Sequence, residues 1–457
     1  MGKINQKMMN NNTFSIIEHQ AFSKEDLQGI FKEKAKKFYQ ELEDFAKNNE
    51  NFLSFKNKNT LKAKNYIGII QTKSGTLEIL PKCTNLDSYK DKECKLSTIS
   101  KEKLLNNYIL NQMSQAKTSE NFYGEDFAFN PKTLLINMLK TLKNSPFKKS
   151  QISSLQISKM PLLEIFIAMF LDELDEVYKK GLKKDYISIE ENRKFFKGKL
   201  QFSEHLKQNL AHKERFFTQS DEFMLDIAPN RLIKSTLNLL KSKTTRHKFK
   251  IIKALEMFDE VRFSTNYEKD FTYKISRHFD YYENLLSWCK IFLQNQTFAP
   301  YKGKNEAFAL LFPMEKLFED YVAHILKKAN PTQNIKTQSS GKYLISKKGE
   351  KCFMLKPDLY IENETILDTK WKIPDSNEDK KHGIAQSDLY QMFAYACKFK
   401  IHDIKLIYPL CERTMNLQDT IKELEFNANE HLAFLNDNNG PLKTNIKVQV
   451  IFAPLPF

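Results

Sequence analysis

KCFMLKPDLYIENETILDTKWK, residues 351–372, predicts two short strands joined by a polar turn. The first strand, over residues 352–361, is dense in apolar and aromatic side chains, and the second begins at Ile366. Each strand carries an acid where a buried strand is usually apolar: Asp358 in the first and Asp368 in the second. Because an unpaired buried charge is costly, each carboxylate is expected to have a partner.

A divalent cation is the natural partner for two carboxylates on neighbouring strands. Mg²⁺ can be held by two such groups while it keeps waters and a phosphate oxygen. We therefore predict that Asp358 and Asp368 bind Mg²⁺, with Mn²⁺ as a substitute. Lys370 would orient the attacking water or stabilise the charge that develops on phosphorus. The alternative for these residues is a surface hairpin with solvated charges.

The pair Pro357-Asp358 followed by Asp368-Thr369-Lys370 resembles the signature of the PD-(D/E)xK nucleases. A helix predicted over residues 313–326 precedes it, with a proline at its start and an apolar face at helical spacing. The resemblance implies a further catalytic acid on such a helix, and Glu319 is the residue we assign. A solvated helix acid is the alternative.

A second predicted helix, over residues 386–398, follows the hairpin and places Gln391 and Tyr395 on one stripe. This pair resembles the helix motif of the RecB-like branch of these nucleases. The resemblance implies that Gln391 and Tyr395 support the metal site and touch the DNA backbone. An ordinary amphipathic helix is the alternative, but the three elements in this order are more specific than any one alone.

Composition favours a nucleic-acid partner. The 457 residues include 72 Lys and Arg against 56 Asp and Glu, a formal net charge of +16.

The six cysteines show no C-x-x-C spacing, which fits a reducing cytoplasm and argues against a zinc site. The N-terminus lacks the apolar segment of a signal peptide, and no apolar run approaches the length of a membrane span. We expect a cytoplasmic protein without a membrane partner.

Further segments resemble the McrC family, the nuclease subunits of McrBC-type modification-dependent restriction systems. Residues 61–71 and 78–82 resemble the N-terminal domain of McrC proteins. Segments that recur in the middle of McrC proteins, in the same order, are 181–186, 190–192, 197–200, 204–205, 209, 221–223 and 230–231. With the nuclease motifs, the resemblance covers the chain from about Leu61 to its end.

The family resemblance implies a partner, an McrB-like AAA+ GTPase hexamer. The chain would dock on that ring, stimulate GTP hydrolysis and cleave double-stranded DNA, in modified form, with Mg²⁺. Recognition of the modified base would belong to the partner. No Gly-x-x-x-x-Gly-Lys-[Ser/Thr] motif is present, so we expect no nucleotide to be bound by this chain.

The expected fold is α+β followed by α/β. Residues 1–157 should form an N-terminal α/β region with a β element, and residues 158–300 a mostly helical middle region that docks the partner. Residues 301–457 should form the PD-(D/E)xK nuclease domain with a central mixed sheet. The apolar run 162–171, interrupted by Glu164, predicts a buried helix, and the apolar alternation over 446–452 predicts a strand.

Two features of the middle region each have more than one possible role. Basic residues crowd the predicted helix near residues 230–250, which suits DNA phosphates, an acidic protein face or simple solvation. His205 and His212 lie seven apart on another predicted helix, where a metal pair competes with solvated histidines.

Two functional hypotheses from different classes follow. The first is an Mg²⁺-dependent endonuclease subunit of a GTP-driven restriction complex. The second is an interaction protein that activates the NTPase and retains a degenerate nuclease fold. A free-standing RecB-like nuclease is a third alternative. The intact Asp358, Asp368 and Lys370 favour the first hypothesis.

Overall fold

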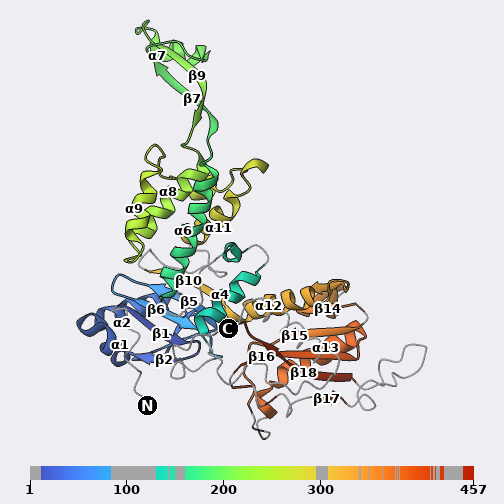
Figure 1. Cartoon of the computed structure of the whole chain (residues 1–457). Coiled ribbons are helices and arrows are strands. Elements are labelled where there is room, and N and C mark those ends of the chain that lie inside the picture. The colour runs from blue at the N-terminus through green and yellow to red at the C-terminus, as the bar shows by residue number, and fades with distance from the viewer. Residues whose placement is uncertain are drawn as a thin grey trace. The chain divides into compact units, whose positions relative to one another are not determined.

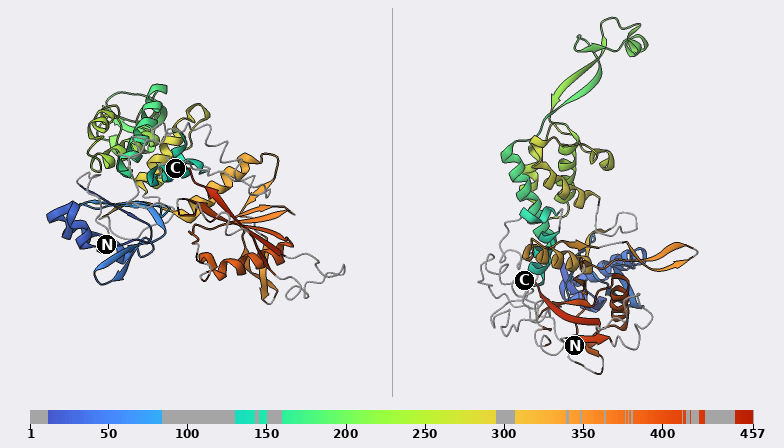
Figure 2. Two further views of the ribbon diagram at one scale, coloured as in Figure 1. Left: turned by 60° about the horizontal axis from the view of Figure 1, so that its bottom comes forward. Right: turned by 90° about the vertical axis from the view of Figure 1, so that its right-hand side faces the viewer.

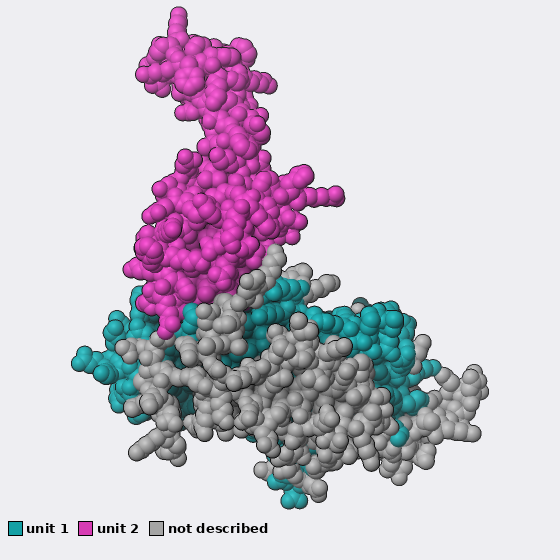
Figure 3. Space-filling view, viewed as in Figure 1, with its two compact units in different colours: residues 1–148, 152–162, 301–457 teal, residues 149–151, 163–300 magenta. Residues whose placement is uncertain are grey.

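The protein is described by a computed structural model that covers most of the chain. The residues described are 12–83, 130–142, 145–149, 160–294, 307–338, 341–347, 349–362, 364–375, 377, 379, 381–411, 413–414, 417, 423–426 and 446–456. They divide into two compact units (Figure 3). Unit 1 contains residues 1–148, 152–162 and 301–457, and unit 2 contains residues 149–151 and 163–300. The division into three regions at 157 and 300 stays a prediction.

The first part of unit 1 is built from small sheets and helices that alternate along the chain. Its elements are β1 (Thr13–Ile17), β2 (Ala21–Ser23), α1 (Lys24–Phe31), α2 (Ala35–Asn48), β3 (Leu53–Asn57), β4 (Thr60–Ala63), β5 (Tyr66–Gln71), β6 (Thr76–Leu80) and α4 (Pro131–Thr141). Strands β2, β4 and β3 form a three-stranded sheet. Strand β10 (Phe308–Pro313) completes a four-stranded sheet of order β1-β6-β5-β10, so strands that lie far apart in the sequence share one sheet.

The four-stranded sheet is packed tightly enough to require a glycine. Every residue of β6 is buried, as are the four central residues of β5. Gly68 in β5 has a φ of +134°, and a Cβ placed there would lie 2.0 Å from the carbonyl oxygen of Leu310 in β10. The resemblance over residues 61–82 therefore maps to a buried sheet and not to an exposed surface.

The second part of unit 1 contains a six-stranded sheet with both parallel and antiparallel pairs. Its order is β11 (Ile335–Thr337), β14 (Leu359–Ile361), β15 (Thr365–Thr369), β16 (Asp403–Leu410), β18 (Ile446–Pro454) and β17 (Glu423–Phe426). The pairs β15–β16 and β16–β18 are parallel, and the others are antiparallel. Helix α12 (Met314–Ala329) packs against β11 and β15, and α13 (Gln386–Phe399) packs against β16 and β18 (Figure 2).

The prediction of one continuous first strand over residues 352–361 was wrong. The chain forms β13 (Glu350–Leu355), leaves strand geometry at residues 356–358, and resumes as β14. Among the described strands, β13 pairs only with β12 (Lys342–Lys347), in a separate two-stranded sheet, whereas β14 pairs with β15 and β11. The break falls at Pro357, which has no N–H to donate to a ladder.

Unit 2 combines helices with a long antiparallel ribbon. Its elements are α6 (Leu162–Lys180), β7 (Asp185–Arg193), β8 (Lys199–Leu200), α7 (Phe202–Asn209), β9 (Phe216–Met224), α8 (Ala228–Lys241), α9 (Lys248–Glu256), α10 (Tyr267–Asp270) and α11 (Tyr282–Leu293). Strands β7 and β9 pair over nine residues each and carry α7 at one end, away from the other helices of this unit (Figure 1). We call residues 185–224 the arm.

Helix α6 confirms the buried helix predicted from the apolar run 162–171. The apolar residues from Leu162 to Leu171 are buried, apart from the half-buried Ala168, and Glu164 is buried with them. The Glu164 carboxylate accepts hydrogen bonds from the Thr244 hydroxyl and from the Thr245 N–H, in the connection between α8 and α9. The charge that interrupts the run thus ties two helices of unit 2 together. No helix in the part of the chain described is long and apolar enough to cross a membrane.

The basic segment near residues 230–250 is two helices rather than one, because the chain turns between α8 and α9. Several of its cations already have partners. The Arg231 guanidinium bonds Asp226, and Lys234 Nζ donates to the carbonyls of Phe258 and Val261. Lys250 pairs with acids of α6 at 2.7 and 3.5 Å. These cations serve the packing of unit 2, which weakens the alternative of a DNA surface here.

We predict that Gly68→Ala lowers the melting temperature of the protein markedly, because the new methyl group meets backbone at a positive φ. A loss of about 2–4 kcal/mol is the scale for such strain. Thermal unfolding monitored by circular dichroism measures the change. Gly29→Ala in helix α1 is the matched control, since nothing lies within 4 Å of its added Cβ, and it should be neutral or stabilising. Equal melting temperatures for the two variants would contradict this account of the sheet.

Candidate active site

The two predicted metal-binding acids face each other across one strand pair. Leu359 of β14 is in register with Leu367 of β15 in an antiparallel pair. Asp358 immediately precedes Leu359 and Asp368 immediately follows Leu367, so the two acids occupy the next opposed positions. Directly opposed residues of an antiparallel pair have Cβ atoms about 5 Å apart. The sheet therefore brings the two carboxylates together, as the sequence predicted.

The Asp358 carboxylate is fixed by the residue that follows Asp368. Its Oδ2 accepts hydrogen bonds from the Thr369 N–H at 2.8 Å and from the Thr369 hydroxyl at 2.7 Å. The Asp358 carbonyl accepts from the Gln338 N–H at 2.9 Å. These bonds occupy one carboxylate oxygen and hold the strand break in place. The other oxygen, Oδ1, is the one that can serve a ligand.

Asp368 is buried with its charge opposed by one cation. Only 1% of the residue is exposed, and its carboxylate forms a close ion pair with Lys370 Nζ. Burial, with the nearby charge of Asp358, raises the pKa of Asp368 from 3.8 to about 7, although Lys370 acts in the opposite direction. The site thus holds more negative charge than the protein itself neutralises.

Lys370 is held on its other side by helix α13. Its Nζ donates to Gln391 Oε1 at 2.9 Å, and Gln391 Nε2 donates to the Tyr395 hydroxyl at 2.8 Å. The Tyr395 hydroxyl in turn donates to the carbonyl of Lys356, at the strand break. Burial alone would lower the pKa of Lys370, but the charge of Asp368 raises it above its ordinary value, so the ammonium stays protonated.

This chain of hydrogen bonds places Gln391 and Tyr395 in the site, as their spacing on the helix predicted. Tyr395 is buried, and burial together with the charge of Asp368 raises the pKa of its hydroxyl. The hydroxyl therefore stays protonated and acts as a donor. Both side chains are bonded within the protein, so they position Lys370 and the Asp358 strand. Contact of either residue with a DNA backbone stays a prediction.

Glu319 of helix α12 lies at the edge of the same site. Its Oε1 accepts hydrogen bonds from Lys316 Nζ at 2.8 Å and from Gln338 Nε2 at 3.1 Å. Burial, reinforced by the charge of Asp358, raises the pKa of Glu319 even though Lys316 lowers it. The structure therefore places Glu319 within electrostatic reach of Asp358 and joins the two through Gln338.

Gln338 is a site residue that sequence reasoning missed. Its N–H and its side-chain amide bond Asp358 and Glu319 respectively, and its backbone has a φ of +46°. A non-glycine residue rarely adopts that conformation, and such strain is concentrated at functional sites. A single glutamine after a short strand carries no signal that would have singled it out.

A second missed feature anchors the loop after Lys370. The indole N–H of Trp371 donates to Glu18 Oε1 at 2.6 Å, and Lys82 Nζ donates to the Trp371 carbonyl at 2.8 Å. The Lys82 N–H bonds the same Glu18 oxygen at 3.0 Å. Glu18 follows β1 and Lys82 follows β6, so the N-terminal sheet directly holds the residue next to Lys370. No local pattern could reveal a contact across 353 positions.

The residues present fit a divalent cation held by two carboxylates. No group of three or more His, Cys, Asp or Glu side chains converges on a metal position within the described residues. Asp358 and Asp368 alone would therefore supply the protein ligands, and water or phosphate oxygens would supply the others, which is the usual habit of Mg²⁺. The raised pKa of Asp368 also fits a cation site, because a bound cation would offset the crowded negative charge that raises this pKa.

The alternative of a metal pair at His205 and His212 is not supported, and the two histidines do not share a helix face. His205 lies on α7, which ends at Asn209, so His212 is outside the helix. His205 Nδ1 is engaged with Asn209 and the Phe217 N–H, and His212 Nδ1 lies 3.3 Å from Glu214. Because the helix stops between the two histidines, the spacing of seven no longer puts them on one face.

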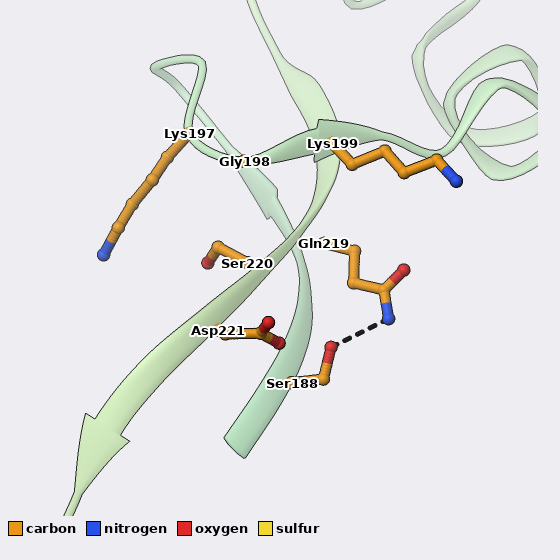
Figure 4. Close-up of a pocket in the computed structure, with 7 residues that line it drawn as sticks. All are labelled: Ser188, Lys197, Gly198, Lys199, Gln219, Ser220 and Asp221. Atoms are coloured by element: carbon orange, nitrogen blue, oxygen red, sulfur yellow. Dashed lines mark hydrogen bonds between the residues drawn. The ribbon is translucent and has the colours of Figure 1, made fainter. Parts of the chain in front are cut away.

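A polar hollow lies on the arm and is separate from these acids. Figure 4 shows the residues that line it. Its volume is about 560 Å³. It is lined by Ser188, Lys197, Gly198, Lys199, Gln219, Ser220 and Asp221. Gln219 Nε2 donates to the Ser188 hydroxyl at 2.8 Å across it. The hollow contains none of the predicted site residues, and no catalytic grouping forms there.

Comparison with known proteins gives a family and a fold. A family model described as McrBC 5-methylcytosine restriction system component matches residues 61–409. A chain in the refined half-complex from the tetradecameric assembly of Thermococcus gammatolerans McrB AAA+ hexamers with bound McrC is similar, with a TM-score of 0.59 and 18% identity. That match covers 97% of this chain and 94% of the other. At this identity the likeness shows the fold alone.

A second match has a lower score. It is the cryo-EM structure of the Thermococcus gammatolerans McrBC complex, with a TM-score of 0.40 and 17% identity, over 70% of this chain and 89% of the other. No match was found among curated proteins. The family model nevertheless spans well over half of the sequence, from β4 to β16 of the six-stranded sheet. This chain therefore belongs to the family of McrBC 5-methylcytosine restriction system components, as a subunit of the McrC type.

Proposed function

We propose that this chain is the DNA-cleaving subunit of an McrBC-type restriction system in the cytoplasm, acting on double-stranded DNA with Mg²⁺. The observation that carries the proposal is the convergence of Asp358, Asp368 and Lys370 at one strand pair, with Gln391 and Glu319 beside them. A degenerate nuclease would have no reason to keep a buried carboxylate of raised pKa beside a protonated lysine. That arrangement favours an active enzyme over a purely activating protein.

The chain's own residues divide the work of phosphodiester hydrolysis. Asp358 and Asp368 would hold Mg²⁺, which when bound supplies charge to stabilise the transition state. Lys370, protonated and aimed by Gln391, would donate a hydrogen bond to the attacking water or to a phosphate oxygen. Glu319 would accept a hydrogen bond from a water at the edge of the site. Mn²⁺ would replace Mg²⁺, since it also favours oxygen ligands.

We also propose that the arm of unit 2 docks on an McrB-like AAA+ GTPase hexamer and stimulates its GTP hydrolysis. The arm exposes large apolar side chains around α7, namely Phe195, Phe196, Phe202, Leu206 and Leu210. Each is at least 59% exposed, which is unusual for a soluble surface unless a partner covers it. The name of the similar structure, McrB hexamers with bound McrC, supports this choice of partner. The family match over residues 61–409 argues against a free-standing nuclease.

We expect Asp358→Asn and Asp368→Asn each to lower the DNA cleavage rate by at least about a hundredfold, since each removes a metal-binding carboxylate. Stimulation of the partner's GTPase should be unchanged, because both residues lie in unit 1. Nicking of plasmid DNA and release of phosphate from GTP are measured in the same preparation. Glu362→Gln is the matched control, an exposed acid after β14, and should cut normally. Cleavage at the wild-type rate by either Asn variant would contradict the assignment of these two residues as metal ligands.

The raised pKa of Asp368 predicts that ionisation of this carboxyl group lowers the free energy of unfolding when no metal is bound. The folded state holds this proton up to about pH 7, whereas the unfolded chain loses it near 3.8. Protonated Asp368 therefore contributes fully to the free energy of unfolding below about pH 4. This contribution, on the order of a few kcal/mol, is lost as pH rises through 7. Asp368→Asn cannot titrate and should escape the loss.

With a chelator present, we expect Asp368→Asn to melt above the wild type at pH 8, and the difference to shrink at pH 5. Melting scans of both proteins at the two pH values provide the measurement. Mg²⁺ should raise the wild-type melting temperature at pH 8 and leave that of the variant unchanged. A difference that stays constant with pH would show that Asp368 is not the titrating group.

For the arm, we predict that the triple change Phe195→Ser, Phe196→Ser and Phe202→Ser reduces stimulation of the partner's GTPase about tenfold or more. The physical reason is loss of the exposed aromatic surface that the partner would cover. Phe249→Ser on α9 is the control, since Phe249 is even more exposed than the three arm residues but lies outside the arm. Stimulation that survives the triple change but fails with Phe249→Ser would move the docking surface to the helices of unit 2.

A further inference from the structure

The ribbon formed by β12 and β13, which we call the wing (residues 342–355), exposes apolar side chains, although β12 also contacts helix α13. Its strands pair from Lys342 with Leu355 to Lys347 with Glu350, and among the described strands the wing joins no other sheet. The exposed apolar residues are Leu344, Ile345, Phe353 and Met354. A two-stranded ribbon gains little stability by itself, so an apolar surface on it points to a binding role.

The wing is also strongly basic. Its described residues include the exposed lysines Lys342, Lys347 and Lys351, and the exposed Lys356 follows β13. Glu350 is the exposed acid among them. Within the described residues none of these lysines forms an ion pair, and Lys351 Nζ instead lies 5.7 Å from the centre of the Tyr343 ring. Exposed lysines that flank an apolar centre complement a polyanion whose bases can take the apolar contact.

Phe353 occupies the centre of β13 in a strained conformation. Its φ is +57°, the left-handed region that favours glycine, and 68% of the residue is exposed. A bulky residue at positive φ costs on the order of 1–3 kcal/mol. Neither core packing nor the strand ladder accounts for a phenylalanine here, because the ring faces solvent and its own pair with Leu344 is missing from the register.

The wing is tied by a short piece of chain to the candidate metal site. Leu355 ends β13, and Asp358 is three residues later. A chain spans at most about 3.5 Å per residue, so Phe353 lies within roughly 18 Å of Asp358. Successive phosphates of one DNA strand are about 3.4 Å apart along the axis, so this reach corresponds to about five base pairs. The Tyr395 hydroxyl, bonded to the Lys356 carbonyl, fixes the junction.

We propose that the wing enters a groove of duplex DNA within about five base pairs of the scissile phosphate. The lysines contact phosphates on either side, and Phe353 lies against the bases. This inference rests on the proposed nuclease function and names the element that grips the substrate. A two-stranded ribbon is one of the two elements that the major groove admits, which matches the form of β12 and β13. The lysine excess favours DNA over a protein surface as the occupant.

The key variant is Phe353→Gly, because glycine accepts the positive φ and the fold should lose nothing. We expect its melting temperature to equal or exceed that of the wild type, while its Kd for a short fluorescent duplex rises about tenfold. Binding is measured by anisotropy with the full chain, with Ca²⁺ in place of Mg²⁺ to prevent cutting. Phe55→Ala in β3 is the control, an exposed aromatic residue of unit 1 that should bind as the wild type does.

A triple variant, Lys342→Gln with Lys347→Gln and Lys351→Gln, tests the phosphate contacts. The slope of log Kd against log salt should fall by about 2–3, since each phosphate contact contributes about 0.9. Cleavage by the complex of each variant with the McrB-like partner and GTP should fall in parallel with affinity. Unchanged affinity, salt slope and cleavage in both wing variants would overturn the proposal, even if Asp368→Asn abolishes cutting and the nuclease assignment stands.

Two further outcomes separate the proposals. If the wild-type complex does not cut DNA but both wing variants still lose duplex affinity, the nuclease function fails and the wing remains a DNA-binding element. If the wing variants bind DNA normally but lose self-association or partner binding in mass photometry, the wing is a protein-docking surface and the proposal is overturned.

Discussion

The rest of the candidate site depends on one buried ion pair, between Asp368 and Lys370 at the end of β15. The strand carries the carboxylate into a position where 1% of it is exposed, so its charge must be opposed locally. Lys370 opposes part of it, and Gln391, Tyr395 and the strand break at Pro357 keep the lysine in place. What remains is excess negative charge beside Asp358, which would favour the binding of the divalent cation that we propose.

Sequence patterns singled out the residues that meet at the site, although Asp358 and Lys370 lie just outside β14 and β15. The two acids and the lysine followed from the hairpin pattern and the resemblance to the PD-(D/E)xK signature. The polar pair on α13 followed from its spacing of four and the resemblance to the RecB-like motif. The mixed α/β character also followed from periodicity. The strand break was missed because apolar residues on both sides of Lys356-Pro357-Asp358 suggested one strand, although Pro357 is a sequence signal for a break. The pairing distinguishes two strands, since β13 pairs with β12 and β14 pairs with β15.

Long-range contacts were beyond sequence reasoning. Glu18 and Lys82 hold Trp371 from the opposite end of the chain, and β10 completes a sheet whose other strands lie more than 200 residues earlier. These contacts explain why residues from both ends form one compact unit. A fragment that ended near residue 294 would therefore lack a strand of its own sheet. The loop beside Lys370 would respond to any change in the N-terminal sheet, because Trp371 connects the two.

The central claim is that Asp358 and Asp368 together bind a divalent cation. Mn²⁺ binding measured by electron paramagnetic resonance tests it without relying on cleavage, on DNA or on the partner. We predict that the wild-type chain depletes the signal of free Mn²⁺ and that Mg²⁺ restores the signal by competition. Asp358→Asn and Asp368→Asn should each leave the free signal undiminished. Binding of equal affinity in both variants would contradict the account.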